Sequence, residues 1–207
     1  MIATFLLVAA VAAPQTPQAA VLGFIRPSVS HVPAHLRIVV QTPRYAIVHF
    51  DDALIESTRG GGQILTKRFA FGWQPIDLSI DNKPFAMCTI RDHGVPDADF
   101  AKLRGPLSSS TKDCLKGADS DQQDTGSSSD VNAVRAEAIG VAEIIPFVRV
   151  IDGYAYMEWW GFGGGENFYK KTPHGWKKFL DGGGAANVGD LTDKGVPLAI
   201  AKALLKQ

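Results

Sequence analysis

Three short landmarks occur twice in this chain, in the same order, and this repetition constrains its fold more than any other feature. They are a glycine run followed by Lys and Gly-Trp (ending at Trp73 and Trp176, 103 residues apart), Gly-Val-Pro (starting at Gly94 and Gly195, 101 apart) and Tyr-Ala (Tyr45 and Tyr154, 109 apart). The separations change only between landmarks, where loops absorb differences in length. The pattern therefore predicts a tandem duplication, and chance matching of glycines explains only the first landmark.

The repeat divides the 207-residue chain into segments. Copy one spans residues 36–105, and residues 131–207 hold a helix followed by copy two. Residues 106–130 between them are rich in Ser and Asp and poor in large apolar side chains, a composition typical of a flexible linker. Residues 13–35 form an N-terminal segment. Each copy is small and would gain stability by packing against its twin.

Turn and helix signals define the elements of copy two. Asp152-Gly153 is a strong signal for a β-hairpin, and the Thr-Pro-His-Gly sequence at residues 172–175 predicts a second one. Gly195 and Pro197 fit the end of one helical turn and the start of a last helix. A further helix is predicted from residue 131, with Asp130 as its N-cap. The fold class is thus α+β: a duplicated small antiparallel β-meander closed by a C-terminal helical tail and packed as pseudo-symmetric halves.

The first residues predict an exported protein. Residues 1–12 form an apolar run that is too short to span a bilayer and ends in Ala-Val-Ala, the small-x-small pattern that signal peptidase cleaves. A buried N-terminal strand or helix is the alternative interpretation. No later stretch reaches the ~20 apolar residues of a transmembrane helix, so the mature chain is expected to be periplasmic or secreted with no integral membrane segment.

Export favours a disulfide between Cys88 and Cys114, the two cysteines of the chain. The bond would close a loop of about 25 residues and contribute about 3 kcal/mol in the chain-entropy model. A redox pair or a metal site would need closer spacing or more ligands.

Composition and motifs exclude several functions. The 21 Lys and Arg balance the 21 Asp and Glu, so no net charge attracts nucleic acid. The glycine triplets do not fit a phosphate-binding loop or a dinucleotide-binding turn, and no metal-binding, nucleophile-elbow or catalytic-cysteine motif is present. We therefore expect no cofactor and no metal.

The order of glycine run, Lys, Gly-Trp and Gly-Val-Pro, with its tail containing Ala and Leu, resembles small exported bacterial proteins of unknown mechanism. Some of these proteins carry the label copper-uptake-associated. The resemblance covers both copies but not the linker, and it rests on turn and packing residues. It implies an exported accessory protein and assigns no catalytic residue. The sequence itself has three Met and no clustered His that would bind copper.

The candidate ligand-binding residues are Trp159, Trp160 and Phe162, next to the glycine run of copy two. Adjacent strand residues point to opposite faces, so one tryptophan is expected to pack inward and the other outward. An exposed indole beside glycines suits a sugar ring, a peptide or a partner protein, whereas packing between the modules is the alternative.

An enzymatic alternative rests on His49 and Asp52 near the end of a copy-one strand. They are weak candidates for general acid and base in a hydrolase whose substrate cleft lies between the modules. A third alternative is a periplasmic metal-handling, copper-associated factor. The first hypothesis remains an exported, non-enzymatic binding or accessory protein that binds an unknown protein or small molecule, and enzymatic activity stays undecided.

Overall fold

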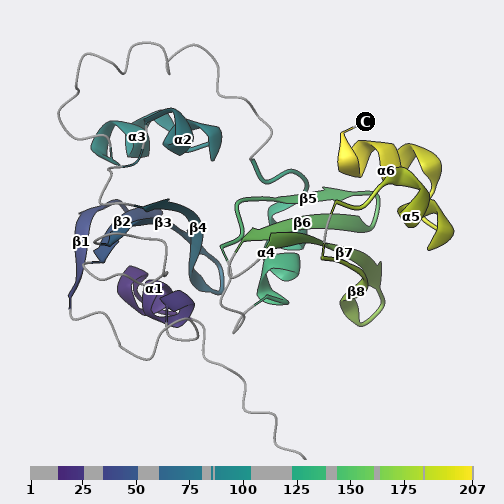
Figure 1. Cartoon of the computed structure of the whole chain (residues 1–207), viewed down its shortest axis with the longest axis horizontal. Helices are drawn as coiled ribbons and strands as arrows, with labels where there is room; N and C mark the ends of the chain where they lie inside the picture. The colour runs from purple at the N-terminus through teal and green to yellow at the C-terminus, as the bar shows by residue number, and fades with distance from the viewer. Residues whose placement is uncertain are drawn as a thin grey trace, which may run out of the picture.

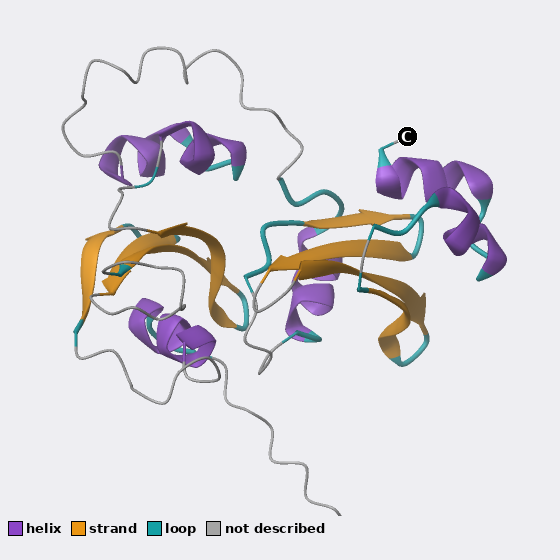
Figure 2. Ribbon diagram, in the orientation of Figure 1, coloured by secondary structure: helices purple, strands orange, loops and turns teal. Residues whose placement is uncertain are grey.

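The computed structural model describes residues 14–25, 35–50, 61–80, 85, 87–103, 123–138, 144–160, 164–183 and 185–206. It contains two four-stranded antiparallel sheets, each with helices on both of its faces (Figure 1). The predicted fold class, a duplicated α+β arrangement, is confirmed. Figure 2 shows the strands gathered in the middle of each module with the helices outside them.

Copy one contains sheet A, in the strand order β1-β2-β3-β4. Its elements are α1 (Pro17–Ile25), β1 (Leu36–Gln41), β2 (Tyr45–Phe50), β3 (Gly62–Phe69), β4 (Gly72–Ile80), α2 (Met87–Asp92) and α3 (Asp97–Leu103).

Copy two contains sheet B, in the strand order β5-β6-β7-β8. Its elements are α4 (Ser128–Ala136), β5 (Val148–Ile151), β6 (Tyr154–Trp160), β7 (Gly164–Thr172), β8 (Gly175–Gly182), α5 (Val188–Asp193) and α6 (Leu198–Leu205). Asp152 and Gly153 form the two-residue turn between β5 and β6, both with positive φ, as a type I′ hairpin requires.

Strand register confirms the duplication residue by residue. Tyr45 lies opposite Lys67 in sheet A, and Tyr154 lies opposite Lys170 in sheet B. A β-bulge between the third and fourth strands also corresponds, because the register shifts after Leu65 in copy one and after Phe168 in copy two. These positions are related by the separations that the sequence landmarks predict. Trp73 and Trp176, which correspond in the same way, are both buried.

A glycine near the start of the third strand of each sheet lies beneath an aromatic ring. Phe50 pairs with Gly62, and Trp159 pairs with Gly165 at the matching place. A β-carbon on Gly165 would lie 2.6 Å from the carbonyl oxygen of Gly182 and 2.8 Å from Cζ2 of Trp159. An aromatic side chain covering a cross-strand glycine stabilises an otherwise weak sheet position. The glycine run therefore has a packing role in both copies.

The helical tails also match. Gly94 and Gly195 have φ values of +65° and +81° and end the first helix of each tail. The valines that follow them, Val95 and Val196, are buried in the hydrophobic clusters of their own modules. A left-handed residue after a short helix redirects the chain, so each tail folds back over its sheet as a helical pair.

Each sheet has two apolar faces with separate clusters. In copy one, α2 and α3 pack on the face with Tyr45, Ile47 and Leu65, and α1 packs on the face with Val48, Phe50 and Ile64. In copy two, α5 and α6 cover one face and α4 covers the other. All the residues of each cluster belong to a single module, so each module has its own core.

Helix α1 gives the repeat one more element than predicted. It packs on sheet A as α4 packs on sheet B, although the sequence places it in the N-terminal segment. Helix α4 begins at Ser128, and its N-cap is Ser127, not Asp130. The Ser127 hydroxyl accepts from the amide of Asp130, and its own proton is donated to the Asp130 carboxylate. Asp130 is therefore the third helical residue, and both its amide and its carboxylate are bonded to the side chain of the N-cap.

The sheet edges are interrupted in different ways. Val39 of β1 lies in a bulge and is 43% exposed. The amide of Ile145 donates to the carbonyl oxygen of Pro75 in β4. Thr125 forms a parallel bridge with Arg149 of β5, so residues at the end of the predicted linker are built into copy two. Lys177 and Lys178 of β8 are exposed.

Three predictions fall outside the described residues. They are the signal peptide over residues 1–12, the disulfide, since Cys114 and the side chain of Cys88 are not described, and most of the predicted linker. Within the described ranges, no helix has the length and apolar character needed to cross a membrane.

The cross-strand glycine gives a first prediction. We expect Gly165→Ala to destabilise the protein by about 1–3 kcal/mol, because the added methyl group overlaps the Gly182 carbonyl and the Trp159 ring. Gly164→Ala is the matched control, since its β-carbon would meet only the Trp159 carbonyl oxygen at 3.6 Å. Urea unfolding followed by circular dichroism measures both; equal losses of stability would contradict the packing role.

Candidate ligand-binding site on copy two

One face of sheet B carries a polar and aromatic group at the end where β6 meets β7. Tyr156, Glu158 and Trp160 alternate along β6 and therefore share a face. Glu166 of β7 lies directly opposite Glu158 in the antiparallel register. All are half-buried except Tyr156, which is buried. We call these four residues the carboxylate pair site.

Each carboxylate of the site has hydrogen-bond donors. The Trp160 indole N–H donates to Glu158 Oε1 at 2.8 Å. Glu166 Oε1 accepts from the Tyr156 hydroxyl at 3.1 Å, and its Oε2 accepts from the Ala186 amide at 2.9 Å. These hydrogen bonds fix the positions of the two side chains.

No cation of the described chain forms an ion pair with Glu158 or Glu166. The Arg149 guanidinium lies over the Tyr156 ring but donates to the carbonyl oxygen of Leu204. Burial, together with the charges of Glu158 and Glu166, raises the pKa of the Tyr156 phenol. Like charges on directly opposed strand positions destabilise a sheet, and the cation that lies nearest among these contacts, Arg149, covers the Tyr156 ring without forming an ion pair with either glutamate.

Copy one carries different chemistry at the matching positions. His49 corresponds to Glu158 and Gln63 to Glu166, and this pair also lies opposite each other in the register. The same fold therefore forms with one neutral amide and one imidazole at these positions. The two carboxylates are a feature of copy two and not a requirement of the meander.

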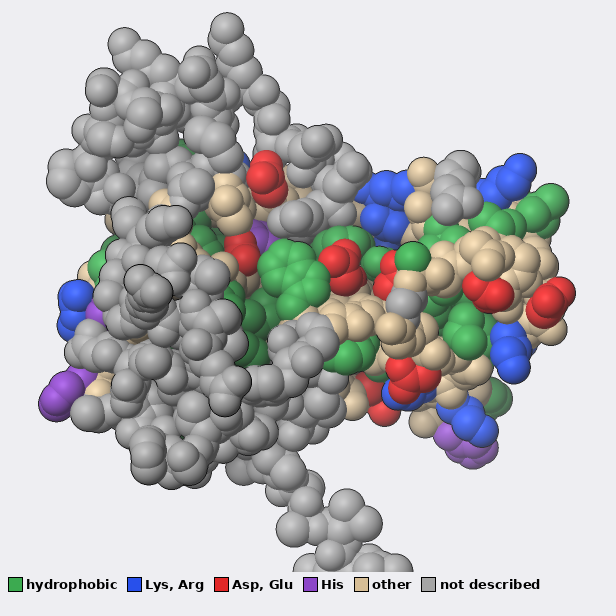
Figure 3. Space-filling model, viewed as in Figure 1, with side chains coloured by type: hydrophobic (Ala, Val, Ile, Leu, Met, Phe, Trp, Pro, Cys, Tyr) green, Lys and Arg blue, Asp and Glu red, His purple; other side chains and the backbone are tan. Residues whose placement is uncertain are grey.

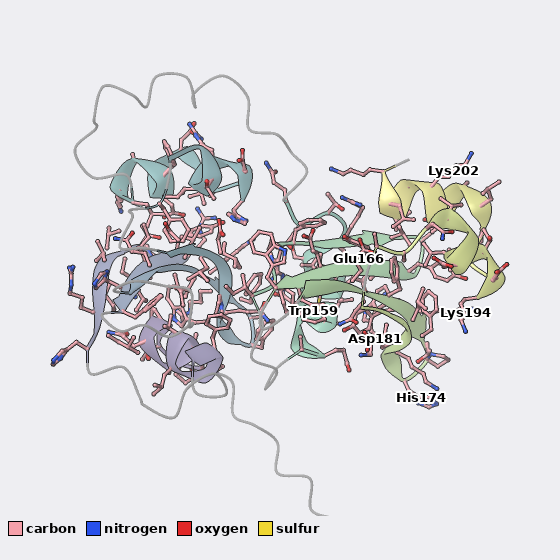
Figure 4. All side chains as sticks on the ribbon, viewed as in Figure 1. Trp159, Glu166, His174, Asp181, Lys194 and Lys202 are labelled. Carbon is pink, nitrogen blue, oxygen red and sulfur yellow. The ribbon has the colours of Figure 1, made fainter. Side chains whose placement is uncertain are left out.

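The structure places the predicted aromatic residues on both faces of sheet B. Trp159 packs against the α4 cluster and over Gly165, whereas Trp160 lies on the opposite face with Glu158. Figure 4 labels Trp159 at the end of sheet B nearest copy one and Glu166 further along the sheet. Phe162 lies outside the described residues. Of the predicted trio, Trp160 belongs to the carboxylate pair site.

Of the two enzymatic candidates, only His49 lies within the described residues. His49 lies within β2 opposite Arg37 and Gln63 and is 9% exposed. Asp52 lies outside the described residues. Copy one contains a buried histidine–aspartate contact at another place. His93 Nε2 lies 2.9 Å from Asp77 Oδ2, and this contact links the helical tail to β4.

A buried arginine joins the two modules. Arg135 of α4 has a side chain that is 1% exposed. Its guanidinium donates to Asp124 Oδ1 at 2.6 Å, to Gln74 Oε1 in β4 at 2.8 Å and to the Ile145 carbonyl at 3.0 Å. The Phe69 ring of copy one lies 4.4 Å from its central carbon. The contact between modules is therefore largely polar, unlike the two cores.

Asp124 completes this junction. Its Oδ2 accepts from Lys67 Nζ of copy one at 3.0 Å, and its Oδ1 also accepts from the Val148 amide at 2.9 Å. Burial alone would raise the pKa of the Asp124 carboxyl, but the charges of Arg135 and Lys67 hold that pKa below its ordinary value. The aspartate is thus ionised and fully bonded at neutral pH.

Sequence reasoning missed Glu166, Asp124 and Arg135. The repeat alignment relates Glu158 to His49, but the partner across the strands follows only from the register. Asp124 belongs to a Ser- and Asp-rich stretch whose composition resembles a solvated linker. Among the described residues, no three His, Cys, Asp or Glu side chains come together to hold a metal ion.

Comparison with known proteins finds no family model, no curated protein and no solved structure that matches the chain significantly. The assignment of the site therefore depends on its geometry. Figure 3 shows acidic side chains among hydrophobic ones on the visible face of copy two.

The junction gives a prediction about pH. Because the pKa of Asp124 is lowered on folding, its contribution to stability is complete above its unfolded pKa of about 3.9 and is lost as the pH falls through the folded value. We expect Asp124→Asn to be less stable than the wild type near neutral pH and to lose less stability between pH 5 and about 2.

Urea midpoints measured across this pH range test the prediction. Asp193 is exposed and forms no ion pair with another described residue, so Asp193→Asn is the control and should retain the wild-type pH dependence. Parallel pH profiles for Asp124→Asn and the wild type would show that Asp124 does not stabilise the junction.

Proposed function

We propose that this chain is an exported, non-enzymatic binding protein whose second module binds a small cationic group at the carboxylate pair site. The observation that supports this proposal is the half-buried pair Glu158 and Glu166, which lie opposite each other in the register of β6 and β7 and form no ion pair with a cation of the described residues. A bound positive charge would offset their repulsion.

The aromatic side chains favour an organic cation. The Trp160 ring is held by its hydrogen bond to Glu158 and shares a face of the sheet with the buried Tyr156, whose own ring is already covered by the Arg149 guanidinium. An ammonium or guanidinium group near an aromatic ring and a carboxylate gains both cation–π and charge-assisted interactions. The ligand class is thus an ammonium or guanidinium compound, either free or as part of a peptide.

The divergence of the two modules agrees with a role in binding. The corresponding positions of copy one hold His49 and Gln63, which do not form a doubly negative site. A binding protein built from two similar modules needs only one of them to carry the recognition residues. Copy one then contributes stability through its own core and through the junction with Arg135.

Export is the second part of the proposal and rests on the leader-like residues 1–12. Cleavage after residue 12 would retain Pro14, whose carbonyl oxygen accepts from the Trp73 amide, and the whole of helix α1. The mature chain would therefore keep both covered faces of sheet A. The resemblance to exported accessory proteins also supports this interpretation.

We expect Glu158→Gln and Glu166→Gln each to weaken binding of organic cations by roughly tenfold, because each removes one charge-assisted contact. The probes are tetramethylammonium, n-butylammonium and guanidinium, titrated into the full chain. The readout is the indole N–H resonance of Trp160, which is hydrogen-bonded to Glu158.

Glu137→Gln, at an exposed position after α4, is the control and should bind as the wild type does. Binding of Ca²⁺ without any of the organic cations would contradict the ligand class. A Trp160 resonance that none of the cations changes would contradict the site itself.

A further inference from the structure

A pocket of about 290 Å³ lies at the junction of the modules, apart from the carboxylate pair site. Copy one contributes the end of β3 and the following turn, and copy two contributes the chain leading into α4 and its first turns. The residues that matter for its chemistry are Lys67, Arg68, Phe69, Ser128, Val131 and Asn132. Its volume is near the lower end of the range for small-molecule sites.

Three polar side chains of this pocket have no protein partner within the described residues. They are the Arg68 guanidinium, the Ser128 hydroxyl and the Asn132 amide, none of which takes part in a side-chain hydrogen bond or ion pair of the described chain. Arg68 and Ser128 are exposed and Asn132 is half-buried, so all three are accessible to a ligand. Together they offer donors to the oxygen atoms of a small molecule.

The electrostatic balance of the pocket favours an anion. Lys67 and Arg68 are positive, and the only carboxylate in its lining is Asp124. Both oxygens of Asp124 are already bonded, one to Arg135 and the Val148 amide, the other to Lys67. The Arg68 charge is therefore left without a counter-ion in the described chain.

The remaining walls are apolar. The Phe69 ring stacks on Phe71 at 5.4 Å and is also held against the Arg135 guanidinium. Val131 lies across from it on α4 and belongs to the core of copy two. These contacts hold the Phe69 side chain in place, and its exposed part and Val131 give the pocket an apolar lining for a compact apolar body.

We propose that the junction pocket binds a small molecule with an anionic oxygen group, a carboxylate or a phosphate ester, on a compact apolar body. The anionic group is placed near Arg68 and the polar side chains of α4, and the apolar body lies against Phe69 and Val131. Because its walls come from both modules, a ligand there stabilises their docked arrangement by mass action.

Benzoate and phenyl phosphate are suitable probes, and benzamide is a neutral control of nearly the same shape as benzoate. The full ¹⁵N-labelled chain is titrated with each compound while the side-chain amide signals of Asn132 are followed. We expect saturable changes with benzoate, phenyl phosphate or both, and binding of benzamide that is weaker by roughly five- to tenfold.

Arg68→Gln should weaken binding of the anions by a similar factor, whereas Arg37→Gln, at an exposed arginine in β1, should leave binding unchanged. The relative affinities of benzoate and phenyl phosphate distinguish the two anionic groups. The proposal is overturned if neither anion binds, if benzamide binds as well as benzoate, or if Arg68→Gln has no effect. None of these outcomes bears on the carboxylate pair site, whose cation test is independent.

Discussion

The arrangement of the two modules depends on the buried guanidinium of Arg135. A guanidinium removed from water must have its donors satisfied, and this one finds acceptors in Asp124, Gln74 and the Ile145 carbonyl. These acceptors come from both modules and from the chain between them. Removing one partner of such a buried pair leaves an uncompensated charge, which is far more costly than losing a surface ion pair. The junction pocket borders this network, so its shape follows from the same interaction.

The two copies share the residues that shape the fold and differ at other positions. The matched bulges, the covered glycines and the glycine-terminated helices recur in both copies because the meander needs them at those positions. Positions at which the fold does not require a particular residue differ between the copies, as His49 and Glu158 illustrate. A buried imidazole–carboxylate pair, His93 and Asp77, holds the tail of copy one, while copy two has Lys194 and Leu180 at the corresponding positions.

Much of the fold follows from the sequence because local signals and the repeat agree. Asp152-Gly153 gives the hairpin, Gly195 ends its helix, and the separation of the landmarks matches the strand register. Helix α1 was missed since its apolar residues lack a polar face that would indicate a helix. Asp124 and Arg135 were missed for another reason, because their partners are distant in sequence. An aspartate in a Ser-rich stretch is usually taken as solvent-exposed, whereas Asp124 is largely buried in the junction. The pairing of Glu158 with Glu166 can be recognised only from the strand register, which the composition of the chain does not reveal.

The structure of the sheet edges affects how readily the protein can aggregate at high concentration. Open strands readily pair with other chains and start fibrils. Here β1 is bent by the bulge at Val39, β4 and β5 are engaged by Ile145 and Thr125, and β8 presents the charges of Lys177 and Lys178. Each outer strand of the two sheets is therefore bent, bonded to a neighbouring segment or charged, features that oppose edge-to-edge pairing between molecules.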